Sequence, residues 1–322
     1  MGCRWLHGAI AVTGLGAASF GLFAPAIAAE PPTLDFGGER LRNAAIESGP
    51  VRVVVSYTPR EGYEETERDN LRYRIFVNGT LEAEGSEAIW MHGQVTLQDL
   101  DSDAIPEVIF NTYTGGAHCC TIFTLYSWRG DQFRRTQTFP LDGGAGYFED
   151  LNGDGFSEFV TFDNTFLYAF SSYVSSYPPT IVLSFQAGGL VDVTRNFRDL
   201  MRSHAYGMYL ATRDRENSAG VNGVLAGYVA QKILLGEYQQ GWEFMLVHYD
   251  RADDWGLETL NPQGQRVREF ADYPSALRAF LIDRGYLTAD NRPNIAIDLS
   301  DRVVESDTQI PPAARSRPQN RQ

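Results

Sequence analysis

Two short segments of this chain carry acidic and amide side chains at the same loop positions. In each, oxygen-bearing side chains occupy positions 1, 3, 5 and 9, and an apolar run follows. The first segment, called loop one (residues 99–107), contributes Asp99, Asp101, Asp103 and Glu107. The second, called loop two (residues 150–158), contributes Asp150, Asn152, Asp154 and Glu158. Such spacing suits a hard cation such as calcium, which takes about six to eight oxygen ligands. We predict calcium at both loops, with loop two the stronger site.

The physical case for a cation is electrostatic. Loop one holds four carboxylates within nine residues, and loop two holds three carboxylates and an amide. Like charges ~5 Å apart repel by about 1–3 kcal/mol per pair at effective dielectric constants from roughly 80 down to 20. A loop held between two strands cannot splay to relieve this repulsion, whereas a bound cation relieves it. The alternative is two solvated acidic turns without metal, and the shared register of the two loops favours the metal.

The first 29 residues resemble a secretory signal. Arg4 supplies a positive start, an apolar stretch runs from about residue 9 to 23, and Ala26, Ala28 and Ala29 offer a small-residue cleavage site. This arrangement is typical of a signal peptide and is too short for a membrane span. We therefore predict residues 1–29 as a signal peptide and a periplasmic or secreted protein.

The charge balance limits the classes of partner. The chain has a formal net charge of −14 at pH 7. Residues 1–29 contain one basic residue, Arg4, and no acidic residue, so the remainder carries −15. Nucleic acids and anionic membranes require cationic surfaces, and we expect neither as a partner. No later apolar run reaches 18 residues, which predicts no membrane insertion.

Two adjacent cysteines, Cys119 and Cys120, remain after the signal segment. Export permits a disulfide. However, consecutive Cα atoms lie about 3.8 Å apart across a trans peptide, below the usual disulfide range of roughly 4.4–6.8 Å. We favour two buried free thiols, and we retain a redox pair, or a metal site with His118, as the alternatives.

The hydrophobic pattern divides the chain into two parts. Residues 30–50 form a lead-in marked by Pro and Gly, and from 51 to 193 the apolar residues alternate with frequent turns. We predict strands here, and a hairpin turn at Asn78-Gly79. The predicted strands are Val51–Tyr57, Leu71–Val77, Thr80–Glu84, Gln94–Leu97, Glu107–Thr112, Cys119–Trp128, Gln132–Phe139, Glu158–Phe162, Phe166–Phe170 and Thr180–Phe185.

Helical spacing replaces this alternation near residue 195. Apolar residues recur at helical intervals up to about residue 290, and Pro274 and Gly285 mark the start and end of one helix. We predict a helical domain over 195–300 and a disordered tail over 303–322. The predicted fold is mainly β, with propeller-blade-like or sandwich antiparallel sheets, followed by a smaller α-helical domain.

The two acidic loops begin 51 residues apart, and the similarity continues into Thr121–Leu125 and Thr180–Leu183. Over roughly residues 94–190 the chain resembles the FG-GAP/VCBS repeat family, whose β-propeller blades carry a D-x-D/N-x-D-G-x-x-D/E calcium loop. The resemblance implies that the carbonyl groups of Ile105 and Phe156, at position 7, join the four side chains of each loop as calcium ligands. Ala104 departs from the family pattern, which has glycine there.

We expect a non-enzymatic calcium-binding module that presents a surface to an unknown protein or carbohydrate. The chain contains no G-x-S-x-G, H-E-x-x-H or Walker motif. The alternative is a periplasmic metal-assisted hydrolase of a polysaccharide or phosphate ester, with His118 or His92 as its base.

Overall fold

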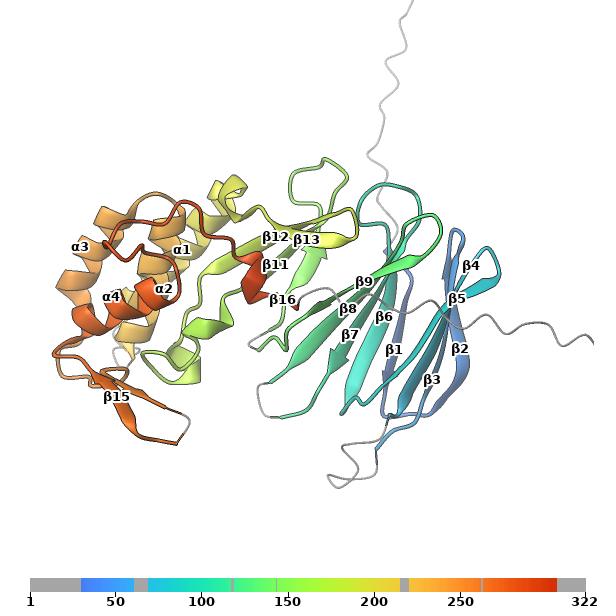
Figure 1. Ribbon diagram of the computed structural model, residues 1–322, viewed down its shortest axis with the longest axis horizontal. Coiled ribbons are helices and arrows are strands. Elements are labelled where there is room, and N and C mark those ends of the chain that lie inside the picture. The colour runs from blue at the N-terminus through green and yellow to red at the C-terminus, as the bar shows by residue number, and fades with distance from the viewer. Residues whose placement is uncertain are drawn as a thin grey trace, which may run out of the picture. The chain divides into compact units, whose positions relative to one another are not determined.

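The computed structural model describes residues 30–60, 69–116, 119–142, 144–214, 220–261 and 263–305. The predicted signal peptide, His118 and the predicted tail from residue 306 onward lie outside the described residues. Within these ranges the chain forms mainly antiparallel β-sheets followed by a smaller C-terminal region of α-helices (Figure 1). The predicted fold class is confirmed.

The first sheet is a four-stranded meander in chain order. It comprises β2 (Leu41–Ser48), β3 (Val51–Tyr57), β4 (Leu71–Val77) and β5 (Thr80–Glu87). Strands β4 and β5 meet at Asn78 and Gly79, whose φ angles are 49° and 80°. A two-residue hairpin with a type I′ turn requires two successive positive φ angles. The predicted turn is confirmed.

The central sheet has six strands in the order β1-β6-β7-β8-β9-β16 (Figure 1). It comprises β1 (Thr33–Gly37), β6 (His92–Gln98), β7 (Glu107–Tyr113), β8 (Thr121–Trp128), β9 (Phe133–Thr138) and β16 (Val304–Glu305). β16 pairs with β9 through Val304 and Thr138. Residues 304 and 305, at the start of the predicted tail, therefore extend this sheet.

The third sheet is a second meander, and the helices follow it. Its strands are β10 (Tyr147–Glu149), β11 (Glu158–Phe162), β12 (Thr180–Gln186) and β13 (Gly189–Asp192). The helices are α1 (Arg198–Arg213), α2 (Val221–Leu234), α3 (Tyr238–His248) and α4 (Tyr273–Asp283), with a hairpin of β14 (Glu258–Leu260) and β15 (Arg266–Glu269) before α4.

Strand β7 shows how the central sheet is buried. Ile109 belongs to the hydrophobic core shared with the third sheet and the helices, whereas Val108 and Phe110 belong to the core shared with the first sheet. Successive side chains of a strand point to opposite faces, so both faces of β7 are covered. This explains why β7 begins with four consecutive buried residues rather than an alternating pattern.

The helices and the third sheet share one hydrophobic core. Phe159 of β11 and Ile181 of β12 belong to the same buried cluster as Val229 of α2 and Leu277 of α4. The predicted boundary at residues 193–195 falls inside this core. Helix α2 is buried in this core on nearly every side, which explains why it is apolar around nearly its whole circumference.

The predicted strand Phe166–Phe170 is wrong. This segment continues a short 3₁₀ turn (Asn164–Phe166) into further turns, and Tyr168 has a φ angle of 59°. Phe166 and Phe170 are buried because their rings pack edge-on against Phe280 of α4, with centroids 4.9 and 5.3 Å away. The apolar alternation therefore reflects helix packing, not strand pairing.

The predicted lead-in, residues 30–50, holds strands β1 and β2. None of the eight β2 residues is fully buried, so its sequence lacks the apolar alternation that marks a strand. Strand β2 forms because it pairs along its length, from Leu41 to Ser48, with the apolar strand β3.

Cys119 and Cys120 are joined by a disulfide, and the peptide bond between them is cis. This pairing differs from the expectation of two free thiols. A role for the pair in redox chemistry stays a prediction.

Candidate metal centre

The two acidic loops occupy equivalent places in two sheets. Loop one joins β6 to β7, and loop two joins β10 to β11. Each following strand begins with a buried glutamate, Glu107 (1% exposed) and Glu158 (2% exposed). The next strand places a serine beside each: Ser127 lies by Glu107, and Ser184 pairs with Glu158. The structure therefore contains an internal duplication of strand, acidic loop and strand.

The duplication extends to individual backbone hydrogen bonds. The amide of Ala104 donates to Asp99 Oδ2 at 2.9 Å, and in loop two the amide of Gly155 donates to Asp150 Oδ2 at 2.9 Å. The buried glutamate closes each loop in the same way. Leu100 N donates to Oε2 of Glu107 at 2.8 Å, and Leu151 N donates to Oε2 of Glu158 at 3.1 Å. The position-5 aspartates also correspond, since Asp103 and Asp154 each accept from the backbone two residues on.

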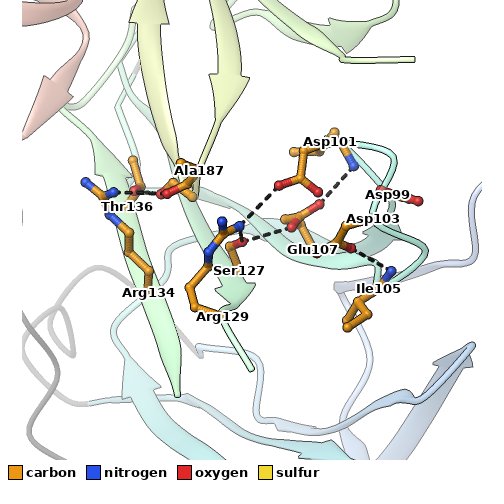
Figure 2. Close-up of polar contacts among 12 residues, drawn as sticks. Asp99, Asp101, Asp103, Ile105, Glu107, Ser127, Arg129, Arg134, Thr136 and Ala187 are labelled. Atoms are coloured by element: carbon orange, nitrogen blue, oxygen red, sulfur yellow. Dashed lines mark hydrogen bonds and ion pairs between the residues drawn. The ribbon is translucent and has the colours of Figure 1, made fainter. Parts of the chain in front are cut away.

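Loop one gathers its carboxylates around one point. Ligand oxygens of Asp99, Asp101 and Glu107 all lie within 4.8 Å of one another. The Oδ1 atoms of Asp99 and Asp101 are buried and have no hydrogen-bond partner among the described residues. A buried polar atom without a partner is rare and costs roughly 1–3 kcal/mol, more if charged. Such a group could hold a cation, and within the same loop Asp103 accepts a hydrogen bond from the Ile105 amide (Figure 2).

One arginine offsets part of this charge. Arg129 Nη1 lies 3.2 Å from Asp101 Oδ2 and 3.4 Å from the Ser127 hydroxyl, as Figure 2 shows. The Asp101 side chain is only 7% exposed, whereas that of Arg129 is 36% exposed. The guanidinium contacts Oδ2 of Asp101, and Oδ1 of Asp99 and of Asp101 have no hydrogen-bond partner among the described residues.

Two carboxyl groups of loop one have raised pKa values. Burial, with smaller contributions from the charges of Asp101 and Asp103, raises the pKa of Glu107 to about 8 despite the hydrogen bonds from Leu100 and Ser127. Burial also raises the pKa of Asp101, and the neighbouring Asp103 adds to the increase. A divalent cation among these groups would reverse both effects.

Loop two satisfies more of its own oxygens. Burial would raise the pKa of Asp150, but hydrogen bonds from the backbone of Gly155, Gly153 and Asp154 hold it below its usual value. The Asn152 amide donates to Asp154 Oδ2 at 2.9 Å. Among the described residues, the group of three acids close enough to hold an ion lies at loop one, although the sequence pattern favoured loop two.

The loops also contact each other. Ser102 Oγ donates to the Gly155 carbonyl at 2.6 Å, and Ser157 N donates to the Leu100 carbonyl at 2.8 Å. Nearby, Arg134 and Thr136 of β9 bind the carbonyls of Ala187 and Gly188 at 3.0 and 2.7 Å (Figure 2). The central and third sheets are thus joined at the edge where the acidic loops lie.

Sequence reasoning did not find Ser127 or Arg129 as members of this site. Both come from β8 and its following turn, 20 or more residues beyond loop one. Only the antiparallel pairing of β7 with β8, in which Val108 lies opposite Tyr126, brings Ser127 beside Glu107.

The histidine proposed as a base lies elsewhere. His92 begins β6 and stacks on Tyr113, with ring centroids 5.0 Å apart. Loop one begins after the other end of this seven-residue strand, about 20 Å away at 3.3 Å per residue. His118 lies outside the described residues.

Fold and site together define a mainly β protein with a duplicated acidic loop and a C-terminal helical region. The chain belongs to the sll0997 family. It is 38% identical over 266 residues to a probable thylakoid lumen protein, sll0997, of Synechocystis sp., covering 77% of this chain and 76% of that protein. The family of the sll0997 C-terminal domain matches residues 201–285, which include most of α1 and all of α2, α3 and α4.

A second relative is longer. The uncharacterized protein y4bJ of Sinorhizobium fredii is 32% identical over 225 residues, which cover 66% of this chain but 35% of that protein. No solved structure matches this chain significantly.

The resemblance to the FG-GAP/VCBS repeat family is wrong. The family that matches is that of the sll0997 C-terminal domain, and the relative that matches over most of its length is sll0997. The physical reason is that the acidic pattern is short. An aspartate that accepts backbone N–H groups and a glutamate that closes the loop meet the needs of any tight connection between such strands.

Proposed function

We propose that this protein is an exported, non-enzymatic binding module whose β-sheets are stabilised by calcium at loop one. The proposal rests on two observations: Asp99, Asp101 and Glu107 each place one carboxylate oxygen within 4.8 Å of the others, and two buried oxygens, Asp99 Oδ1 and Asp101 Oδ1, have no partner among the described residues. The ligand set consists only of carboxylates, which suits a hard cation. The signal-like residues 1–29 and a relative named a probable thylakoid lumen protein support export.

The role of the ion would be to tie sheets together. Loop one spans β6 and β7 of the central sheet and contacts loop two of the third sheet through Ser102. An ion at loop one would therefore rigidify the edge where both sheets meet. Its contribution to the free energy of unfolding would equal RT ln(1 + [Ca²⁺]/Kd), about 2.7 kcal/mol at calcium about 100 times its Kd.

Thermal unfolding with added calcium or with a chelator tests the proposal. We expect calcium to raise the Tm of the wild-type chain by about 5–10 °C under those conditions. Asp99→Asn should abolish the shift, because the amide oxygen still accepts from Ala104 but the charge is lost. The matched variant Asp150→Asn makes the same change in loop two and should keep most of the shift. Equal Tm values with calcium and with chelator would remove the proposal.

Loop two is a second, weaker calcium site in this proposal. Its ligands would be the side chains of Asp150, Asn152, Asp154 and Glu158 with the carbonyl of Phe156. Calcium counted by elemental analysis should then fall by one equivalent in Asp150→Asn. No such loss would limit calcium to loop one.

The partner of the module is a protein or a carbohydrate in this proposal. No helix among the described residues is both long and apolar enough to cross a membrane. In the hydrolase alternative His92 would be the base. It lies at the opposite end of β6 from the acidic loop, too far to act on a ligand bound there.

A further inference from the structure

A cavity of about 370 Å³ lies between α1 and the segment that precedes β12. Ser203, His204, Gly207 and Met208 of α1 form one side. The other side comes from the segment 162–178 and from Asp142. The cavity involves neither acidic loop, so its role is independent of the calcium proposal.

Two helical glycines determine where the second wall lies. A Cβ atom at Gly227 of α2 would lie 1.6 Å from the Tyr177 carbonyl oxygen, and one at Gly223 would lie 1.9 Å from Ser171 Oγ. These glycines are four residues apart and share one face of α2. The backbone of residues 171–177 therefore lies directly against the helix. This close approach holds Tyr173 and Tyr177 in the cavity wall.

A third residue of α2 continues the same contact. Gln231, four residues beyond Gly227, accepts the amide of Thr180 through Oε1 at 2.9 Å. The hydroxyl of Thr180 in turn contacts Nδ1 of His204. The wall is thus fixed at both ends, and the imidazole is oriented by β12 rather than by the cavity contents.

The lining is mainly apolar and carries one formal charge. Its apolar surfaces come from Phe162, Leu167, Tyr173, Tyr177, Pro178 and Met208. Asp142 is the charged group, and the Tyr173 hydroxyl donates to its Oδ1 at 3.1 Å. Among the described residues, no lysine or arginine lines the cavity. Burial lowers the pKa of His204, which favours the neutral imidazole.

These features select a class of ligand. Among the described lining residues an anion would meet the carboxylate of Asp142 and no lysine or arginine, so anions are disfavoured. Apolar walls require an apolar body, and the cavity volume lies at the small end of the range for ligand sites. Tyrosine faces and a carboxylate together attract a cation.

We propose that this cavity binds a small organic cation, namely an amine attached to a ring or short apolar body. The amine would contact Asp142, and the apolar body would lie between the aromatic wall and α1 at Gly207 and Met208. The net charge of the whole chain adds a long-range attraction for cations.

Three probes with one phenylethyl body test the proposal: phenethylamine, 2-phenylethanol and 3-phenylpropionate. Calorimetric titration of the wild-type chain at pH 7 should give the amine roughly tenfold tighter binding than the alcohol, with the carboxylate weakest. Asp142→Asn keeps an acceptor for Tyr173 and should reduce the preference for the amine to about twofold or less. Equal affinity for the three probes, or no binding at millimolar concentration, would overturn the proposal.

Position 207 locates the binding site. Gly207 lines the cavity, and a Cβ atom there meets no atom within 4 Å, so a larger side chain can be placed at the cavity wall without a clash at its base. Gly207→Leu should abolish binding of phenethylamine, whereas the control Gly207→Ala should change its Kd by about threefold or less. Unchanged circular dichroism verifies folding of both variants. Unchanged amine binding by Gly207→Leu would place the ligand elsewhere and overturn the proposal.

Discussion

The hydroxyl of Ser102 in loop one donates a 2.6 Å hydrogen bond to the carbonyl oxygen of Gly155 in loop two. These residues are 53 positions apart and belong to connections in two different sheets. Glycine suits this point because its φ angle is 88°, and a Cβ atom there would also lie 2.5 Å from Ser102 Oγ. The two acidic loops therefore differ in one respect that matters: one supplies a side chain, and the other supplies bare backbone to receive it.

Replacement of Ser102 separates this hydrogen bond from backbone strain. Ser102 has a φ angle of 58°, which glycine adopts without penalty. Ser102→Ala should lower the free energy of unfolding by about 1 kcal/mol, because the hydroxyl is lost and the strain is kept. Ser102→Gly loses the same hydroxyl but relieves the strain, so its stability should stay within about 0.5 kcal/mol of wild type. Urea unfolding measures both, and equal losses would show that the backbone at 102 is unstrained.

Ala104 stands where loop two has a glycine. Its φ angle is 66°, close to the 88° of the equivalent Gly155. We expect Ala104→Gly to stabilise the chain by about 1 kcal/mol, since a residue with a Cβ atom is strained in this left-handed region. Ala44→Gly in β2 is the control. Ala44 has no such conformation, and its replacement should destabilise by about 0.5–1 kcal/mol. If both Ala104→Gly and Ala44→Gly lowered the free energy of unfolding, Ala104 would not be strained.

The raised pKa of Glu107 predicts a pH dependence for the calcium-free protein. Between its ordinary value of 4.5 and its folded value of about 8, the folded state binds more protons than the unfolded state. The free energy of unfolding should therefore fall as pH rises through this window. Glu107→Gln mimics the neutral form and should flatten the profile. Urea unfolding of calcium-stripped protein from pH 5 to about 8.5 measures the slope. A rising profile that Glu107→Gln leaves unchanged would contradict the prediction.

Local patterns identify much of the fold here. The strands Val51–Tyr57, Leu71–Val77 and Glu158–Phe162 are predicted with the bounds that the structure shows, because apolar residues and flanking turns mark both ends. Strand β2 is not predictable in this way, since its exposed residues depend on pairing with β3.

The candidate site likewise has residues that local patterns predict and residues that they do not. The nine-residue spacing identifies Asp99, Asp101 and Glu107 because all three lie within one loop. The contact between Asp101 and Arg129 spans 28 residues and depends on the register of β7 against β8. The cavity wall depends on Gly227, whose role appears only when α2 and Tyr177 meet. Sequence patterns thus predict side chains supplied by one loop, but not those that pairing and packing bring to it.

Gly227 and Gly207 provide opposite tests of the helical region, since each lies within a helix. An alanine in a helix is favoured over glycine by about 1 kcal/mol when its methyl group has room. At Gly207 the methyl group meets no atom within 4 Å, so Gly207→Ala should raise the Tm by about 2–4 °C. At Gly227 the methyl group would lie 1.6 Å from the Tyr177 carbonyl, and the segment would have to move. We expect Gly227→Ala to destabilise by about 3 kcal/mol or more and to weaken phenethylamine binding, because it displaces the cavity wall. Thermal unfolding and calorimetry measure both effects. A Tm increase for Gly227→Ala would show that residues 171–177 do not lie against α2.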